Sequence, residues 1–263
     1  MRNLSVYFRT ELSFSAPVTE HSFTLRCMPP DGPTQRTADM RLRLEPDVRY
    51  ALQRDGLGNL LQVGRLRAPH TALSYTVRGL VCTDLSRRDR TPPAPFYCCP
   101  SPRTAPTGDL RAFLAALPAQ PSPLARARLL SRAVGGHFTY TPGATRVTTT
   151  AGEAFALRRG VCQDYAHVFI ALCRLAGIPA RYVSGLPEGD GETHAWGEVY
   201  CEGAWYGLDP TRRCEADEGY VRLNTGRDYA DCPIERGVFR GTAKQTQSVY
   251  MKVAAADCAA ALS

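Results

Sequence analysis

Short segments in which apolar and polar residues alternate dominate the first third of the chain. They occupy residues 22–27, 40–44, 60–64 and 73–77. An alternation with a period of two is typical of β-strands that bury one face. Turn-forming residues separate these segments, at 29–33 and 55–59. Short strands at this spacing predict a β-rich domain, resembling a small β-sandwich, over residues 1–86.

Proline dominates the next stretch, residues 87–108, which contains six prolines. Proline fixes the backbone and provides no N–H group for a sheet. We therefore expect an extended connector here. The remaining residues, 109–263, are predicted to form a second domain.

Helical patterns open this second domain. We predict helices over residues 109–117, 122–136, 150–160 and 162–176. Thr150 and Glu153 have the spacing of a capping box at the start of the third helix. The fourth helix is apolar on nearly every side and should be buried. Gly177 provides a natural C-terminal cap for it.

Strand patterns return after the helices, at residues 180–186, 193–201, 204–209 and 247–253. A run of helices followed by a run of strands is typical of an α+β domain. The predicted fold class is therefore α+β, with helices packed on an antiparallel sheet and a β-sandwich-like domain at the N-terminus.

Charge and composition narrow the class of protein. The 263 residues carry a formal net charge of +7, and arginine supplies nearly all of the positive side chains. The arginines are spread along the sequence, which favours a solvated basic surface over a nucleic-acid site. No stretch approaches the roughly 18 to 20 apolar residues of a membrane span, and the N-terminus shows no secretory signal. We expect a cytoplasmic protein that binds neither nucleic acid nor membrane, and the sequence leaves its oligomeric state open.

The ten cysteines form an even set that would also fit a disulfide framework. However, the chain is long and contains no C-x-x-C pair, which argues against a disulfide scaffold and a zinc ribbon. We interpret most of them, including Cys258, as reduced, buried apolar residues. No metal and no other cofactor is expected.

Cys162 stands apart because it follows Gly160 and Val161 at the first turn of the buried helix. The free N–H groups and the positive end of the helix dipole favour a thiolate there. The same N–H groups could hold an oxyanion that forms beside the sulfur. The alternative is an inert structural cysteine.

A hairpin provides the partners that a cysteine nucleophile needs. A two-residue turn at Glu202 and Gly203 pairs Cys201 with Ala204. In this register His194 and Asp209 are diagonal neighbours on one side of the hairpin. A carboxylate beside an imidazole fixes its tautomer, and the other ring nitrogen can take a proton from a thiol.

Three sequence boxes then resemble the transglutaminase-like superfamily. They are the cysteine box at 160–167, the histidine box at 193–200 and the aspartate box at 207–211. Residues 55–59, 68–70, 226–234 and 236–241 are similar to segments of the bacterial members, which carry a β-rich N-terminal domain.

The resemblance implies a papain-like core and a bacterial cysteine peptidase whose catalytic triad is Cys162, His194 and Asp209. It places the catalytic domain at 109–263. Three further residues, Tyr140, Gln163 and Trp196, are candidates for an oxyanion donor or for walls of the substrate site.

The expected reaction is acyl transfer from an amide of a peptide or protein through a thioester on Cys162. Water or an amine then resolves the thioester, giving hydrolysis or a transglutaminase reaction. We favour hydrolysis because no calcium-binding or acceptor-binding feature is visible. The rival class is a non-catalytic binding scaffold.

Overall fold

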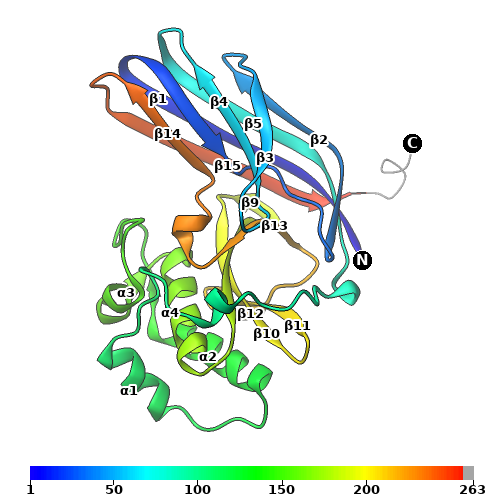
Figure 1. Ribbon diagram of the computed structural model, residues 1–263, viewed down its shortest axis with the longest axis vertical. Helices are drawn as coiled ribbons and strands as arrows, with labels where there is room; N and C mark the ends of the chain where they lie inside the picture. Colours follow the sequence, from blue (N-terminus) through cyan, green and yellow to red (C-terminus); the bar gives the residue numbers. More distant parts are fainter. Residues whose placement is uncertain (257–263) are drawn as a thin grey trace.

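The computed structural model describes residues 1–256 and shows two large β-sheets, with the helices gathered against the smaller of them (Figure 1). Cys258 lies outside the described residues.

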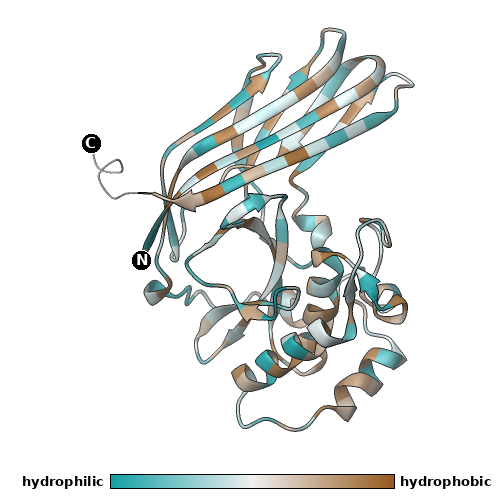
Figure 2. Cartoon of the chain, turned by 180° about the vertical axis from the view of Figure 1, so that it is seen from behind, coloured by the Kyte–Doolittle hydropathy of each residue, from teal (hydrophilic) through white to brown (hydrophobic). Residues whose placement is uncertain are grey.

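The larger sheet has eight strands. They are β1 (Arg2–Leu25), β2 (Gln35–Glu45), β3 (Tyr50–Arg54), β4 (Leu60–Leu66), β5 (His70–Thr83), β9 (Gly189–Gly191), β14 (Glu235–Arg240) and β15 (Gln245–Ala255). The long strand β1 organises the sheet: its first half pairs with β5 and β15, and its second half with β4 and β14. Bands of alternating hydropathy run along the long strands (Figure 2).

Two features of this sheet differ from the prediction. Strand β1 extends from Arg2 to Leu25 and is much longer than the alternating segment 22–27, and its buried positions include the polar residue Thr10. Strands β14 and β15 return from the C-terminal part of the chain to pair with β1. The predicted second domain, 109–263, thus includes strands that complete the N-terminal sheet.

Within residues 1–256, the second domain contains four α-helices. They are α1 (Gly108–Ala116), α2 (Pro123–His137), α3 (Ala151–Leu157) and α4 (Cys162–Leu175). The smaller sheet is antiparallel, with the spatial order β12 (Cys214–Glu215), β11 (Ala204–Asp209), β10 (His194–Cys201), β8 (Ala180–Pro187) and β13 (Tyr220–Gly226). The predicted α+β class is confirmed.

Short elements complete the chain. They are the parallel pair β6 (Thr139–Tyr140) and β7 (Arg159–Gly160), and the 3-10 helices η1 (Leu85–Arg87), η2 (Pro95–Cys98) and η3 (Tyr229–Asp231).

Local signals predicted most helix ends to within one residue, but α3 ends at Leu157 and not at the predicted residue 160. The capping box of Thr150 and Glu153 is present, and Gly177 takes the left-handed conformation (φ +74°) beyond α4. The cap of α1 is Thr107, whose hydroxyl accepts a hydrogen bond from the Leu110 N–H, and Asp109 lies in the first turn. Helix α4 is buried along nearly its whole length, as its apolar composition predicts.

The smaller sheet lies between two apolar cores. One core contains α4 and the inner sides of the other helices. Leu186 of β8 and Val221 and Leu223 of β13 point the other way, into the core of the eight-stranded sheet. The smaller sheet is thus covered on both faces and separates the core of the helical domain from the core of the larger sheet.

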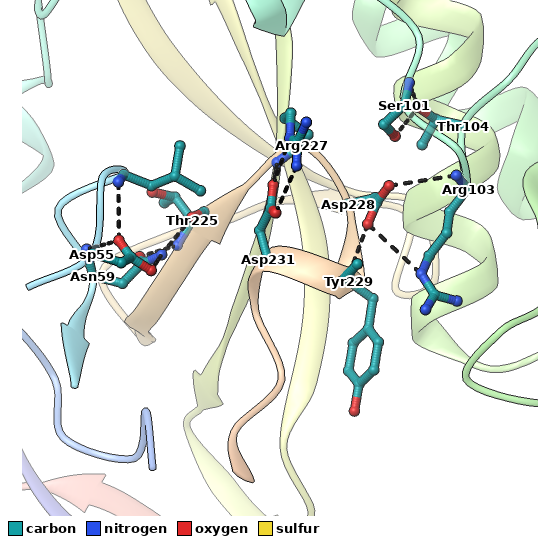
Figure 3. A network of polar contacts seen from close by, with 12 residues as sticks. Asp55, Asn59, Ser101, Arg103, Thr104, Thr225, Arg227, Asp228, Tyr229 and Asp231 are labelled. Atoms are coloured by element: carbon teal, nitrogen blue, oxygen red, sulfur yellow. Dashed lines mark hydrogen bonds and ion pairs between the residues drawn. The ribbon is translucent and has the colours of Figure 1, made fainter. Parts of the chain in front are cut away.

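Polar contacts fasten the two parts of the molecule at the end of β13 (Figure 3). The Asn59 amide donates to the Thr225 carbonyl at 2.9 Å and accepts from the Thr225 N–H at 2.8 Å. Asp55 holds this turn by accepting the Asn59 N–H at 2.9 Å. Asp228 contacts Arg103 of the connector, with 3.7 Å between Nε and Oδ1. The segment after β13 is thereby held in place where it borders the site described next.

Candidate active site

Cys162 is the first residue of α4 and is half-buried. The Asp164 carboxylate fixes this helix start, because its Oδ2 accepts from the Val161 N–H at 2.8 Å and from the Thr145 hydroxyl at 2.7 Å. The Asp164 carboxylate lies so close to the backbone that only glycine fits at position 160, because a Cβ there would lie 2.4 Å from Asp164 Oδ2. The sulfur is therefore held at the positive end of a helix, as the sequence predicts.

The β10–β11 hairpin has the predicted register. Cys201 pairs with Ala204 and Gly197 with Leu208. His194 and Asp209 meet on one side of the hairpin, with 2.7 Å between His194 Nε2 and Asp209 Oδ2. Since Asp209 occupies Nε2, the Nδ1 atom of the ring is the nitrogen left for Cys162.

Asp209 is fully buried and accepts four hydrogen bonds. Its Oδ1 accepts from the N–H groups of Thr211 and Arg212 at 2.9 and 3.1 Å. Its Oδ2 accepts from Tyr220 at 3.0 Å as well as from His194. Burial alone would raise the pKa of Asp209, but these donors and the charge of His194 hold it below its ordinary value. The carboxylate is therefore an ionised, fixed partner for the imidazole.

The charge state of His194 follows from its surroundings. Burial opposes a positive charge on the ring, but the interactions with Asp209 and Cys162 outweigh burial and raise the pKa of His194 to about 9. At neutral pH the ring is an imidazolium. The ring therefore places a positive charge between the Asp209 carboxylate and Cys162.

A cavity of about 330 Å³ opens over Cys162 and His194. Helix α4 and strands β8 and β10 form one wall, and η3 and the residues after it form a second. The opposite wall comes from the larger sheet, through Phe8 and Thr10 of β1 and Gln247 and Val249 of β15. Both ends of the chain therefore shape the space above the sulfur, which the sequence did not indicate.

The three accessory candidates have different positions. Gln163 is buried and lines the cavity, and its Nε2 donates to the Val147 carbonyl at 3.4 Å. Tyr140 is 53% exposed and outside the cavity lining, although burial first, and then the charge of Cys162, raises its pKa. Trp196 does not wall the cavity: it stacks beside His194, with 6.4 Å between ring centroids, and lines a separate small cavity with Tyr220.

Tyr220 is a functional candidate that the sequence analysis missed. Its hydroxyl contacts Asp209, and its ring packs edge-on against Trp196 with 5.2 Å between centroids. Burial first, and then the charge of Asp209, raises the pKa of Tyr220, so the hydroxyl keeps its proton and acts as a donor. No sequence signal marks this residue, because it approaches Asp209 from a strand outside the hairpin.

The other cysteines vary more than predicted. All nine in the described part are free, but Cys98, Cys99 and Cys214 are exposed and only four are buried. In residues 1–256, no cluster of three or more His, Cys, Asp or Glu side chains is placed to hold a metal ion. Over the same residues, no helix combines the length and apolar character needed to cross a membrane.

Comparison with known proteins identifies the family. Residues 112–210 match the model of the transglutaminase-like superfamily, and residues 4–82 match that of the bacterial transglutaminase-like N-terminal region. An uncharacterised protein of Mycobacterium tuberculosis is 31% identical over 89% of this chain and 86% of its own length. The chain belongs to the transglutaminase-like superfamily.

Other relatives of this transglutaminase-like protein have assigned names. A protein-glutamine gamma-glutamyltransferase of Pseudomonas aeruginosa is 33% identical over 47% of this chain and 21% of its own length. A crystal structure from Cytophaga hutchinsonii, of a protein provisionally assigned as a cysteine protease, has a TM-score of 0.80 and 22% identity. It covers 97% of this chain and 91% of its own, which establishes the fold over both domains.

Proposed function

We propose that this transglutaminase-like protein hydrolyses peptide or protein amides through a thioester on Cys162. The observation that carries the proposal is the combination of two placements: Cys162 at the start of α4, and His194 in the same cavity with its Nε2 held by a buried carboxylate. A nucleophile, a base and a residue that orients the base are the elements of a cysteine triad.

The reaction follows from these groups. The Cys162 thiolate attacks the amide carbonyl carbon, and the N–H groups at the start of α4 stabilise the oxyanion. The His194 imidazolium then gives its proton to the amide nitrogen, so that the C–N bond breaks and the amine leaves. Neutral His194 next takes a proton from water, whose oxygen attacks the thioester. The C–S bond then breaks, which releases the carboxylic acid and restores the Cys162 thiolate beside the His194 imidazolium.

Amine transfer is the second candidate, because the Pseudomonas aeruginosa relative carries the name of a glutamyltransferase. Here an amine instead of water attacks the thioester, with the same three residues. The two outcomes separate when a glutamine peptide is incubated with a labelled primary amine. We expect the peptide to gain a carboxylate; efficient amine incorporation would overturn the assignment to hydrolysis.

A peptide library tests catalysis as a whole. The wild-type protein should release free amines from a subset of peptides, and Cys162→Ala should release none. A Cys201→Ala variant is the matched control, since Cys201 is buried outside the cavity. If wild type and Cys162→Ala behave alike, the protein is the non-catalytic scaffold that forms the rival class.

A further inference from the structure

The walls of the cavity carry a one-sided set of charges. Apart from the triad residues Cys162 and His194, the acidic or basic side chains that line it are those of Glu192 and Glu235. No lysine or arginine lines it, although the whole chain has 32 basic and 25 acidic residues. The cavity is thus locally acidic in a protein with an excess of arginine.

Glu235 has no counterion in the described structure. It opens β14 opposite Leu25 of β1 and is partly buried. Its carboxylate makes no hydrogen bond or ion pair with another side chain of residues 1–256, and burial raises its pKa. By contrast, the buried Asp89 and the partly buried Glu198 pair with Arg181 at 2.9 and 2.6 Å. Removing an unpaired carboxylate from water is unfavourable unless a binding partner compensates for it.

A buried hydroxyl lines the same cavity as this carboxylate. Thr10 lines the cavity and is fully buried, and its Oγ1 has no hydrogen bond of standard geometry within the described residues. The Tyr75 hydroxyl, which interacts with Thr10, is fully buried and does not line the cavity. The Glu235 carboxylate and the Thr10 hydroxyl oxygen can both accept hydrogen bonds.

We propose that this wall binds the basic side chain of a lysine or arginine in the substrate, while the neighbouring amide carbonyl faces Cys162. An ammonium or guanidinium supplies both the positive charge that would pair with Glu235 and a donor for the Thr10 oxygen. The inference rests on the proposed function, because it treats the cavity as the substrate site. Glu192 adds negative charge at the exposed rim and favours the approach of a basic peptide.

The first experiment measures selectivity. The substrates are alanine-based fluorogenic peptide amides. In each peptide one position before the scissile bond carries lysine, arginine or norleucine. For the wild type we expect kcat/KM to favour the basic residue over norleucine by at least about tenfold at one position. Glu235→Gln should bring that ratio close to one. The exposed Glu202→Gln, at the hairpin turn, is the matched control and should keep the wild-type ratio.

The second experiment needs no turnover. Cys162→Ala is titrated by calorimetry with the lysine peptide and its norleucine counterpart. We expect tighter binding of the lysine peptide, lost when Glu235→Gln is added. Selective binding with no turnover by wild type would refute the proposed hydrolysis and leave the cation site standing. Equal binding of the two peptides, no binding of either, or a preference that survives Glu235→Gln would overturn the cation site.

Discussion

Tyr220 donates its hydroxyl to Asp209 Oδ2 at 3.0 Å, the same oxygen that binds His194 at 2.7 Å. Tyr220 thus fixes the position of the carboxylate against which the imidazole is oriented. Removing the hydroxyl leaves two backbone donors on the other oxygen, so the geometry should loosen without being lost.

Tyr220→Phe should therefore lower kcat/KM by about tenfold and stability by about 1 kcal/mol, the usual value of one buried hydrogen bond. Steady-state kinetics and urea unfolding measure the two effects. Tyr250→Phe, on an exposed ring in β15, serves as the control. A loss as large as that of Asp209→Asn would show that Tyr220 does more than position Asp209.

The raised pKa of His194 sets the alkaline limit of activity. The imidazolium persists below its pKa of about 9, so kcat/KM should fall as the pH rises through 9. The same sign applies to stability: the contribution of the charged ring is complete below its ordinary pKa of about 6.5 and is lost through pH 9.

Asp209→Asn should move this alkaline limit to lower pH. Burial still lowers the pKa of His194 in this variant, and the carboxylate that raises it is gone. We also expect a loss of about 10²- to 10⁴-fold in kcat/KM. A pH–rate profile of both proteins checks the shift. An alkaline limb that stays near 9 in the variant would contradict the role assigned to Asp209.

Gly160→Ala should destabilise the start of α4. Its new methyl group would meet Asp164 Oδ2, which two hydrogen bonds hold in place. We expect a loss of about 1 to 3 kcal/mol and reduced activity. Gly136→Ala in α2 is a matched control, since a Cβ there meets nothing within 4 Å, and it should be neutral or stabilising by up to about 1 kcal/mol. Equal unfolding midpoints for both variants would refute this account of Gly160.

Asn59→Ala should loosen the attachment of the β3–β4 turn to β13. It removes both hydrogen bonds to the Thr225 backbone from a residue that is 3% exposed. We expect a loss of about 1 to 3 kcal/mol in urea unfolding. The exposed Gln53→Ala, on the neighbouring strand, should change stability little. If Asn59→Ala and Gln53→Ala have the same free energy of unfolding, the hydrogen bonds between Asn59 and Thr225 contribute nothing measurable to stability.

The sequence predicted the parts of the site that depend on local rules. The hairpin register that joins His194 to Asp209 follows from a two-residue turn, and the place of Cys162 follows from a glycine, a helix period and a cap. Such signals lie within a few residues of the side chains they position.

The rest depends on contacts between distant segments. Strands β14 and β15 complete a sheet begun by β1, and only this pairing brings Glu235 and Thr10 to the cavity. Tyr220 reaches Asp209 from a third strand. Trp196 shares a side with His194, as its alternation predicts, but it packs beside the ring and away from the cavity. No pattern along the sequence predicts these contacts between distant segments.

The central claim, an activated Cys162, is tested most directly by alkylation with iodoacetamide at pH 6, followed residue by residue by peptide mapping. The exposed Cys98, Cys99 and Cys214 provide reference thiols in the same molecule. We predict that Cys162 reacts at least about tenfold faster than these three, and that His194→Ala abolishes the difference. A Cys162 that reacts no faster than the exposed thiols would contradict the account.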